Sequence, residues 1–398
     1  MFRLKRLYGY LGFNEPLLDS RRTNRCGQEV TDGSGEGEQP VSLTVGEVLS
    51  AESGGGFPLL AKLDNTRYII VYRVASSNAL QAYVCSYDSN LTVSKGATVA
   101  LGTGATSEFT LTSLSDTKVL VVYHRAATNE VFARVLTISD TTISAVGAEN
   151  TLATTAYSAS AGLYYSATSV LLFYRISGGC CFRAVTVTGD TVTVGSQINV
   201  TATGSASTSG RSARMSGTLS LIIFSDGDGT KAMAVDFNGT TVTEGVPLVI
   251  SSWFAGGSDI AVAVQPNSDV AALSTRSSGA DLIVTTVTLD GIDVVRDTDV
   301  AYVSVDADIL NSHDASCIGG GTNAVVFNEN VSGTRRPFLE TQTFSASGVV
   351  LRQELTLLSG LLTQSIHTVR MTNTKLAWCG ANSPSGSGPI ITQVLHIT

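Results

Sequence analysis

The sequence contains few charged residues, few histidines and no long apolar run. Charged residues make up 15% of the 398-residue chain, which has four histidines and a formal net charge of -8. This acidic balance argues against a general nucleic-acid binder, because such proteins carry an excess of positive charge. No stretch reaches the length of a transmembrane helix, about 18 or more apolar residues. We therefore expect no nucleic-acid partner and no membrane partner.

Recognisable targeting and cysteine patterns are also missing. The basic N-terminus never becomes an apolar run of signal-peptide length, so we expect a soluble protein that is not classically secreted. The six cysteines fit neither a zinc pattern nor a disulfide framework, which favours folding in a reducing cell. The adjacent Cys180 and Cys181 point to opposite faces of a predicted strand, so a structural role for both is unexpected.

No motif of a known catalytic type is present. His313-Asp314 invites comparison with a triad, but no nucleophile elbow or other activated nucleophile accompanies it. Residues 225–230 are similar to the Asp-box of sialidases, yet the register fails and we interpret them as a polar hairpin turn. Paired carboxylates of the glycosidase kind cannot be placed. We therefore predict that the protein is not an enzyme and has no metal site and no cofactor.

The strongest positive signal is an internal repeat. A short apolar strand ending in an aromatic or bulky residue recurs at intervals of 49 to 54 residues. Its seven copies are residues 69–72, 120–123, 171–174, 221–224, 270–273, 324–327 and 375–378. Another short strand precedes each copy, and an alternating third strand follows it. In several copies a fourth strand comes next. Four antiparallel strands in about 50 residues is the period of a β-propeller blade.

The two ends of the chain predict how the ring closes. The seventh unit stops at Thr398 after its third strand, and it lacks a fourth. Val41–Leu49 resembles the fourth strands of other units but precedes the first one, so we place it in the seventh blade. The predicted fold is an all-β, seven-bladed propeller over residues 41–398. Residues 1–40 form an extended N-terminal arm that ends in a Gly-rich linker.

The repeat has a recognisable texture in residues 119–123, 133–138 and 141–147, where two Val-rich strands and a Thr-rich strand are joined by polar turns. This texture resembles propeller repeats in structural proteins of tailed bacteriophages, and the resemblance covers residues 41–398. It implies a virion component, made in the host bacterial cytoplasm and assembled onto a capsid or tail. Its implied partners are other virion structural proteins.

The arm combines large apolar side chains with six basic residues, which a solvated tail would not normally do. We hypothesise that it anchors the propeller by ordering on another protein, and the alternative is packing against the propeller's own flank. The residues expected to carry the anchor are Arg3, Lys5, Arg6, Tyr8, Tyr10, Phe13, Arg21 and Arg22.

Several repeats place a basic residue close to the hairpin that joins the second and third strands. These residues are Arg73, Arg125, Arg175, Arg276, Arg335 and Arg336. They would form a partly basic face for an acidic partner or a host-surface glycan. The alternative is that each arginine is solvated and covers a neighbouring tyrosine. The sequence therefore leaves two functions, a non-enzymatic virion structural protein and a glycan-binding propeller lectin for host attachment.

Overall fold

The computed structural model describes two compact units, Met1–Gln39 and Pro40–Thr398. The residues described are 22–23, 29–30, 42–52, 54–125, 127–154, 156–176, 179–200, 210–226, 229–239, 241–251, 260–265, 268–276, 282–303, 313–319, 322–331, 334–345, 348–357, 363–382 and 388–397. In the first unit, β1 (Arg22–Thr23) pairs antiparallel with β2 (Glu29–Val30). The anchor residues Arg3, Lys5, Arg6, Tyr8, Tyr10, Phe13 and Arg21 lie outside the described residues. The anchor therefore stays a prediction.

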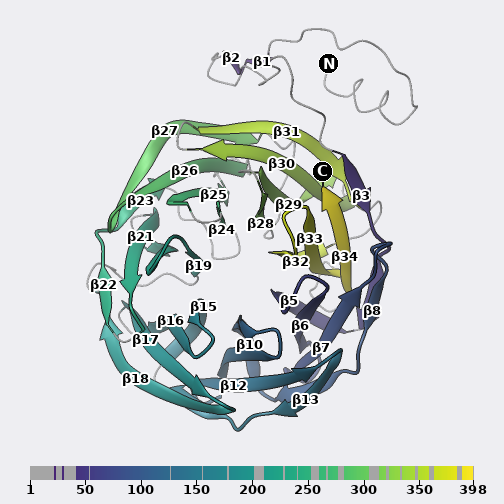
Figure 1. Cartoon of the computed structure of the whole chain (residues 1–398), viewed down its shortest axis with the longest axis vertical. Helices are drawn as coiled ribbons and strands as arrows, with labels where there is room; N and C mark the ends of the chain where they lie inside the picture. Colours follow the sequence, from purple (N-terminus) through teal and green to yellow (C-terminus); the bar gives the residue numbers. More distant parts are fainter. Residues whose placement is uncertain are drawn as a thin grey trace. The chain divides into compact units, whose positions relative to one another are not determined.

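The second unit is the predicted seven-bladed propeller, built from seven antiparallel sheets (Figure 1). The first strand of each blade lies innermost in the ring, and the second lies next to it. The first strands are β5 (Gly55–Lys62), β10 (Ala105–Ser115), β15 (Ala156–Ser166), β19 (Gly210–Arg214), β24 (Ile260–Val264), β28 (His313–Gly319) and β32 (Thr363–Arg370). The second strands are β6 (Arg67–Val74), β11 (Lys118–Arg125), β16 (Ser169–Ile176), β20 (Leu219–Asp226), β25 (Val270–Arg276), β29 (Thr322–Val331) and β33 (Lys375–Asn382).

The third and fourth strands complete each blade on its outer side. The third strands are β7 (Leu80–Tyr87), β12 (Glu130–Ser139), β17 (Gly179–Thr188), β21 (Gly229–Phe237), β26 (Leu282–Asp290), β30 (Thr334–Ser345) and β34 (Ile390–Ile397). The fourth strands are β18 (Thr191–Asn199), β27 (Asp293–Val303) and β31 (Gly348–Thr356), and elsewhere they are split into two pieces. The split pairs are β8 (Val93–Lys95) with β9 (Val99–Gly102), β13 (Thr142–Val146) with β14 (Asn150–Ala153), β22 (Val242–Glu244) with β23 (Leu248–Ser251), and β3 (Leu43–Val45) with β4 (Leu49–Glu52).

The core is divided into seven apolar clusters, and each cluster lies between two neighbouring blades. The side chains of a second strand alternate between the clusters on its two sides. Ile69 and Val71 pack toward blade 2, whereas Tyr68, Ile70 and Tyr72 pack toward blade 7. A strand covered on both faces needs apolar residues at every position, which explains the uninterrupted apolar runs of the repeat.

The same geometry corrects the expectation for the adjacent cysteines. Cys180 is 3% exposed in the cluster between blades 3 and 4, and Cys181 is fully buried in the cluster between blades 2 and 3. Both thiols are structural because both faces of a blade are covered. Each of the five cysteines in the described part of the chain is buried and carries a free thiol.

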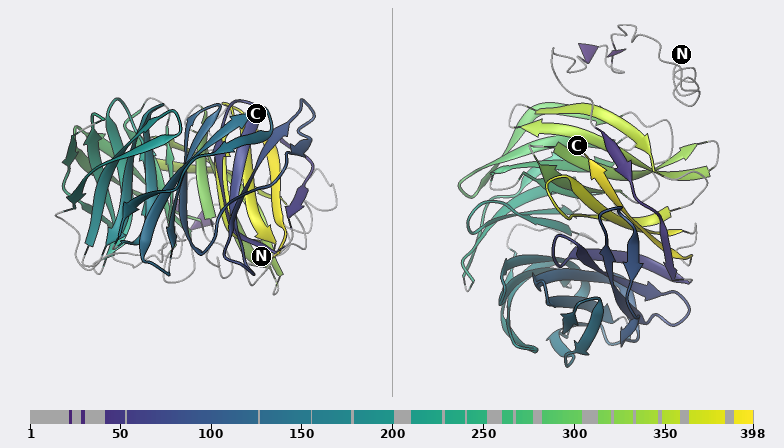
Figure 2. Two further views of the ribbon diagram at one scale, coloured as in Figure 1. Left: turned by 90° about the horizontal axis from the view of Figure 1, so that it is seen from below. Right: turned by 45° about the vertical axis from the view of Figure 1, so that its right-hand side comes forward.

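The ring closes as the sequence predicts. Leu43 and Val45 of β3 pair with Ile397 and Leu395 of β34, and β4 pairs with the other end of the same strand. Figure 2 shows the closing strand beside the C-terminal strand that completes blade 7. The outermost strand of blade 7 therefore comes from the opposite end of the chain. Within the described residues, no helix is long and apolar enough to cross a membrane.

Glycines in the split outer strands let neighbouring blades approach closely. The N–H groups of Gly46, Gly96 and Gly245 bond to the third strand of their own blade. A Cβ atom at Gly96 would overlap the carbonyl oxygen of Thr141 in the next blade, and a Cβ at Gly46 or Gly245 would meet the next blade's carbonyl in the same way. The next blade's turn thus packs directly on the glycine backbone.

We predict that Gly96→Ala lowers the free energy of unfolding by about 1–3 kcal/mol, because the added methyl group must displace a backbone carbonyl of blade 2. The matched control is Ser94→Ala at an exposed position two residues away, which should change stability by less than about 0.5 kcal/mol. Denaturant midpoints measure both effects. Equal stability of the two variants would contradict this packing.

Candidate binding site at the channel mouth

The first strands surround a central channel and have no strand partner on their inner side (Figure 1). Side chains from neighbouring blades therefore bond to their free backbone groups. Ser113 of blade 2 donates to the Lys62 carbonyl of blade 1, and the Lys62 ammonium donates to the Met371 carbonyl of blade 7. Asp314 of blade 6 accepts from the Thr368 backbone N–H at 2.7 Å. Polar contacts of this kind therefore join neighbouring blades along the channel wall.

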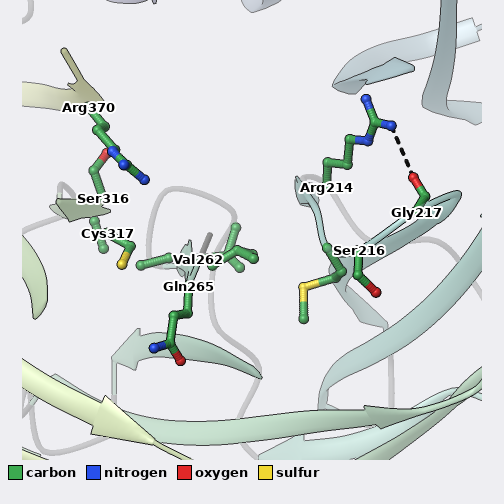
Figure 3. A pocket seen from close by; sticks show the side chains of 12 residues that line it. Arg214, Ser216, Gly217, Val262, Gln265, Ser316, Cys317 and Arg370 are labelled. Carbon is green, nitrogen blue, oxygen red and sulfur yellow. Dashed lines mark hydrogen bonds between the residues drawn. The ribbon is translucent and has the colours of Figure 1, made fainter. Parts of the chain in front are cut away.

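The end of the channel beside the turns between first and second strands is hollowed into a pocket of about 600 Å³. The first strands of blades 4 to 7 and the turns after them provide its walls. Figure 3 shows Arg214 and Arg370 on opposite sides of the pocket, with Ser316 beside Arg370 and Gln265 between the two sides. The Arg214 guanidinium donates to the Gly217 carbonyl at 3.0 Å. We call this end of the channel the channel mouth.

A second pocket of about 490 Å³ lies where blades 7 and 1 meet at the channel mouth. Lys62 and Arg370 line it together with the polar side chains of Asn65 and Asn373. Arg370 lines both pockets, so it belongs to each of them. The Lys62 ammonium donates to Asn65 Oδ1 at 2.8 Å, and the Arg370 guanidinium donates to Asn373 Oδ1.

The three cations of the channel mouth occupy the same position of the repeat. Lys62, Arg214 and Arg370 are each the last residue of a first strand, in blades 1, 4 and 7. The residue after each one is a buried Leu or Met whose N–H bonds to the first residue of the second strand. The sequence prediction does not include these residues, because it concerns the basic residues near the hairpins between second and third strands, at the other face of the ring. The sequence pattern that could have identified them is a basic residue followed by Leu or Met, just before the turn between the first and second strands.

A polar cluster lies on the inner strands of blades 4, 6 and 7. Asp314 Oδ2 is 3.7 Å from His367 Nδ1, and both side chains are about 15% exposed. Burial raises the pKa of Asp314, and the positive charge of Arg211 opposes that rise. Burial and the same arginine hold the pKa of His367 well below its usual value, so its imidazole is neutral. The sequence pairs Asp314 with His313, whereas the fold brings it to His367 of the next blade.

The basic residues predicted near the second hairpin are engaged with their own blades where the structure describes them. The Arg73 guanidinium lies over the Phe57 ring at 4.8 Å. Arg125 lies over the Phe132 ring at 4.2 Å and forms an ion pair with Glu149 at 2.6 Å. Arg175 is half-buried at the end of β16.

For three predicted residues of that face the structure describes only the backbone. Arg276 lies in β25, and Arg335 and Arg336 lie in β30, but their side chains are outside the described residues. A basic binding surface at this face therefore stays a prediction. Among the side chains that the structure describes, no group of three or more His, Cys, Asp or Glu residues could hold a metal ion.

Comparison with known proteins identifies the fold but no family. No protein-family model matches the sequence, and no curated protein matches it. The lectin BP39L from Burkholderia pseudomallei aligns over 86% of this chain and 96% of its own, with 10% identity and a TM-score of 0.62. A protein of unknown function from Dyadobacter fermentans aligns over 90% and 99%, with 12% identity and a TM-score of 0.53. A mutant of the NanB sialidase from Streptococcus pneumoniae aligns over 88% and 70%, with 9% identity and a TM-score of 0.52.

We predict that His367 makes the protein less stable in mild acid. The unfolded chain takes up a proton near pH 6.5, whereas the folded protein keeps the imidazole neutral, so stability falls as the pH drops below that value. Well below pH 6.5 the loss should approach about 1.4 kcal/mol per pH unit. In His367→Gln this loss should disappear, and the matched change His396→Gln should leave it in place. Thermal unfolding of the three proteins at several pH values measures the effect, and identical pH profiles would contradict the assignment.

Proposed function

We propose that the protein is a non-enzymatic propeller that binds glycans at the channel mouth. The observation that carries this proposal is the pocket between blades 4 and 7. It sets the donors of Arg214, Gln265, Ser316 and Arg370 beside the small apolar side chain of Val262. A few convergent polar groups on a partly apolar wall are typical of small-molecule sites. Sugars suit such a wall because their hydroxyl groups bond to the donors and their C–H faces cover the apolar part.

The lining of the two pockets supports a binding role without catalysis. Glycoside hydrolysis ordinarily needs two carboxylic residues on either side of the bond that breaks. Among the described residues that line the pockets, none is an Asp or a Glu. Asp314 and His367 are occupied in contacts between blades 6 and 7, which gives that pair a structural role.

The comparison with the Burkholderia pseudomallei protein adds support of a second kind. That protein is a lectin, and its fold matches nearly the whole propeller of this chain. At 10% identity the likeness concerns the fold alone. It supports the proposal only by showing that a ring of this kind serves carbohydrate binding elsewhere.

A place in a phage-like particle is a separate proposal, which rests on the repeat texture of the sequence. In it, residues 1–40 anchor the propeller to other virion proteins and the channel mouth faces a host-surface glycan. Deleting residues 1–40 should then abolish incorporation into the particle and leave the propeller folded. Unchanged incorporation of the truncated protein would contradict the anchor.

We predict that the full-length protein binds a subset of the sugars on a glycan array and hydrolyses none of them. Arg214→Ala should weaken binding of the best glycan about tenfold or more, because it removes a charged donor from the pocket. Lys118→Ala is the matched control, since Lys118 pairs with Asp190 at 2.6 Å and lines neither pocket. Isothermal titration calorimetry measures the affinities. Absence of any bound glycan would contradict the proposed function.

A further inference from the structure

The channel mouth brings two like charges together at one pocket. Lys62 of blade 1 and Arg370 of blade 7 both line the pocket where these blades meet. Burial lowers the pKa of Lys62, the charge of Arg370 lowers it further, and the charge of Asp64 opposes this fall. Among the residues that the structure describes, no carboxylate forms an ion pair with either group. Lys62 donates hydrogen bonds to the uncharged oxygens of Asn65 and Met371, and Arg370 donates to the uncharged oxygen of Asn373.

The acidic residues described nearby are committed to other contacts. Asp64 forms an ion pair with Arg67 at 2.7 Å and also accepts hydrogen bonds from Thr66. Asp269 accepts a hydrogen bond from Ser216 beside the larger pocket. Asp64 acts on Lys62 through its charge without an ion pair between them, and no described carboxylate lines either pocket, so Lys62 and Arg370 keep an excess of positive charge where blades 7 and 1 meet. An anion bound between two like charges gains from both and relieves their repulsion.

The arrangement of the charges indicates an extended ligand. Arg214 lies across the larger pocket from Arg370, and Lys62 lies with Arg370 in the smaller one. Each pocket has a volume in the range of about 300–1,000 Å³ that holds drug-sized ligands. A ligand that extends past Arg370 from one pocket into the other would contact a positively charged side chain in each pocket. A chain of sugars with acidic groups on several units presents negative charge to both pockets.

We propose that the channel mouth binds an acidic oligosaccharide, whose carboxylate or sulfate groups are held by Arg370 together with Lys62 and Arg214. This inference rests on the proposed glycan-binding function and names the class of its ligand. Arg370 is the central residue, because among the described residues it alone lines both pockets. A guanidinium suits this role, since its planar donors bind a carboxylate or sulfate through two hydrogen bonds.

The test is calorimetric titration of the full-length protein with three probes. The acidic probes are hexagalacturonate, which carries carboxylates, and a heparin-derived hexasaccharide, which carries sulfates. The neutral control is the methyl ester of hexagalacturonate, which keeps the sugar chain and removes its charge. We expect at least one acidic probe to bind ten times more tightly than the ester or better. Raising the salt from about 0.1 M to 1 M should weaken this binding, because the Debye length falls from about 10 Å to 3 Å.

Three variants locate the charges that bind. Arg370→Gln should lower the affinity for the acidic probe at least tenfold, and Lys62→Gln and Arg214→Gln should each lower it several-fold. Lys118→Gln removes the same charge at the start of β11, where Lys118 pairs with Asp190 and lines neither pocket, and should leave the affinity unchanged. Thermal unfolding of each variant checks that the ring stays folded, because Arg214 is exposed whereas Lys62 and Arg370 are half-buried.

The outcomes separate the two proposals. Preferential binding of neutral glycans on the array, with neither acidic probe bound, overturns the acidic ligand and leaves glycan binding standing. Acidic binding that Arg370→Gln does not weaken overturns the site. Absence of binding to every carbohydrate overturns the proposed function and this inference with it.

Discussion

The propeller depends on one constraint, that every blade is covered on both faces by its neighbours. The second strands are apolar at successive positions, so an uncovered face would expose a continuous patch of Val, Leu, Ile and Tyr. Only a closed ring covers all of these faces. The pairing of β3 and β4 with β34 achieves closure by joining the two ends of the propeller into one blade. Packing of the outer turns on bare glycines then sets how closely successive blades approach.

The channel and its mouth are consequences of that closure. Seven first strands meet around an axis with their inner edges unpaired, and polar side chains from neighbouring blades bond to those edges. Blades 1, 4 and 7 end their first strands in Lys62, Arg214 and Arg370. Because closure places blade 7 beside blade 1, residues far apart in sequence share one pocket. We infer that glycan binding at the channel mouth requires the closed ring.

The fold could be predicted from the sequence because the same pattern of strands and turns recurs seven times. The period of the apolar strands predicts the blades, and the missing fourth strand of the last unit predicts the closing segment. The candidate site could not be predicted from the sequence in the same way, because it depends on contacts between blades. Asp314 meets His367 across a blade boundary, which no local motif reveals. Cys180 and Cys181 were misjudged for the same reason, since the expectation considered a strand with one buried face.

A crystal structure of the protein with a bound acidic hexasaccharide would show directly where the ligand binds. We expect density for the sugar at the channel mouth, with an acidic group between Arg370 and Lys62 and a second one facing Arg214. A sugar bound at the hairpins between second and third strands, or on the outer strands of the blades, would contradict it.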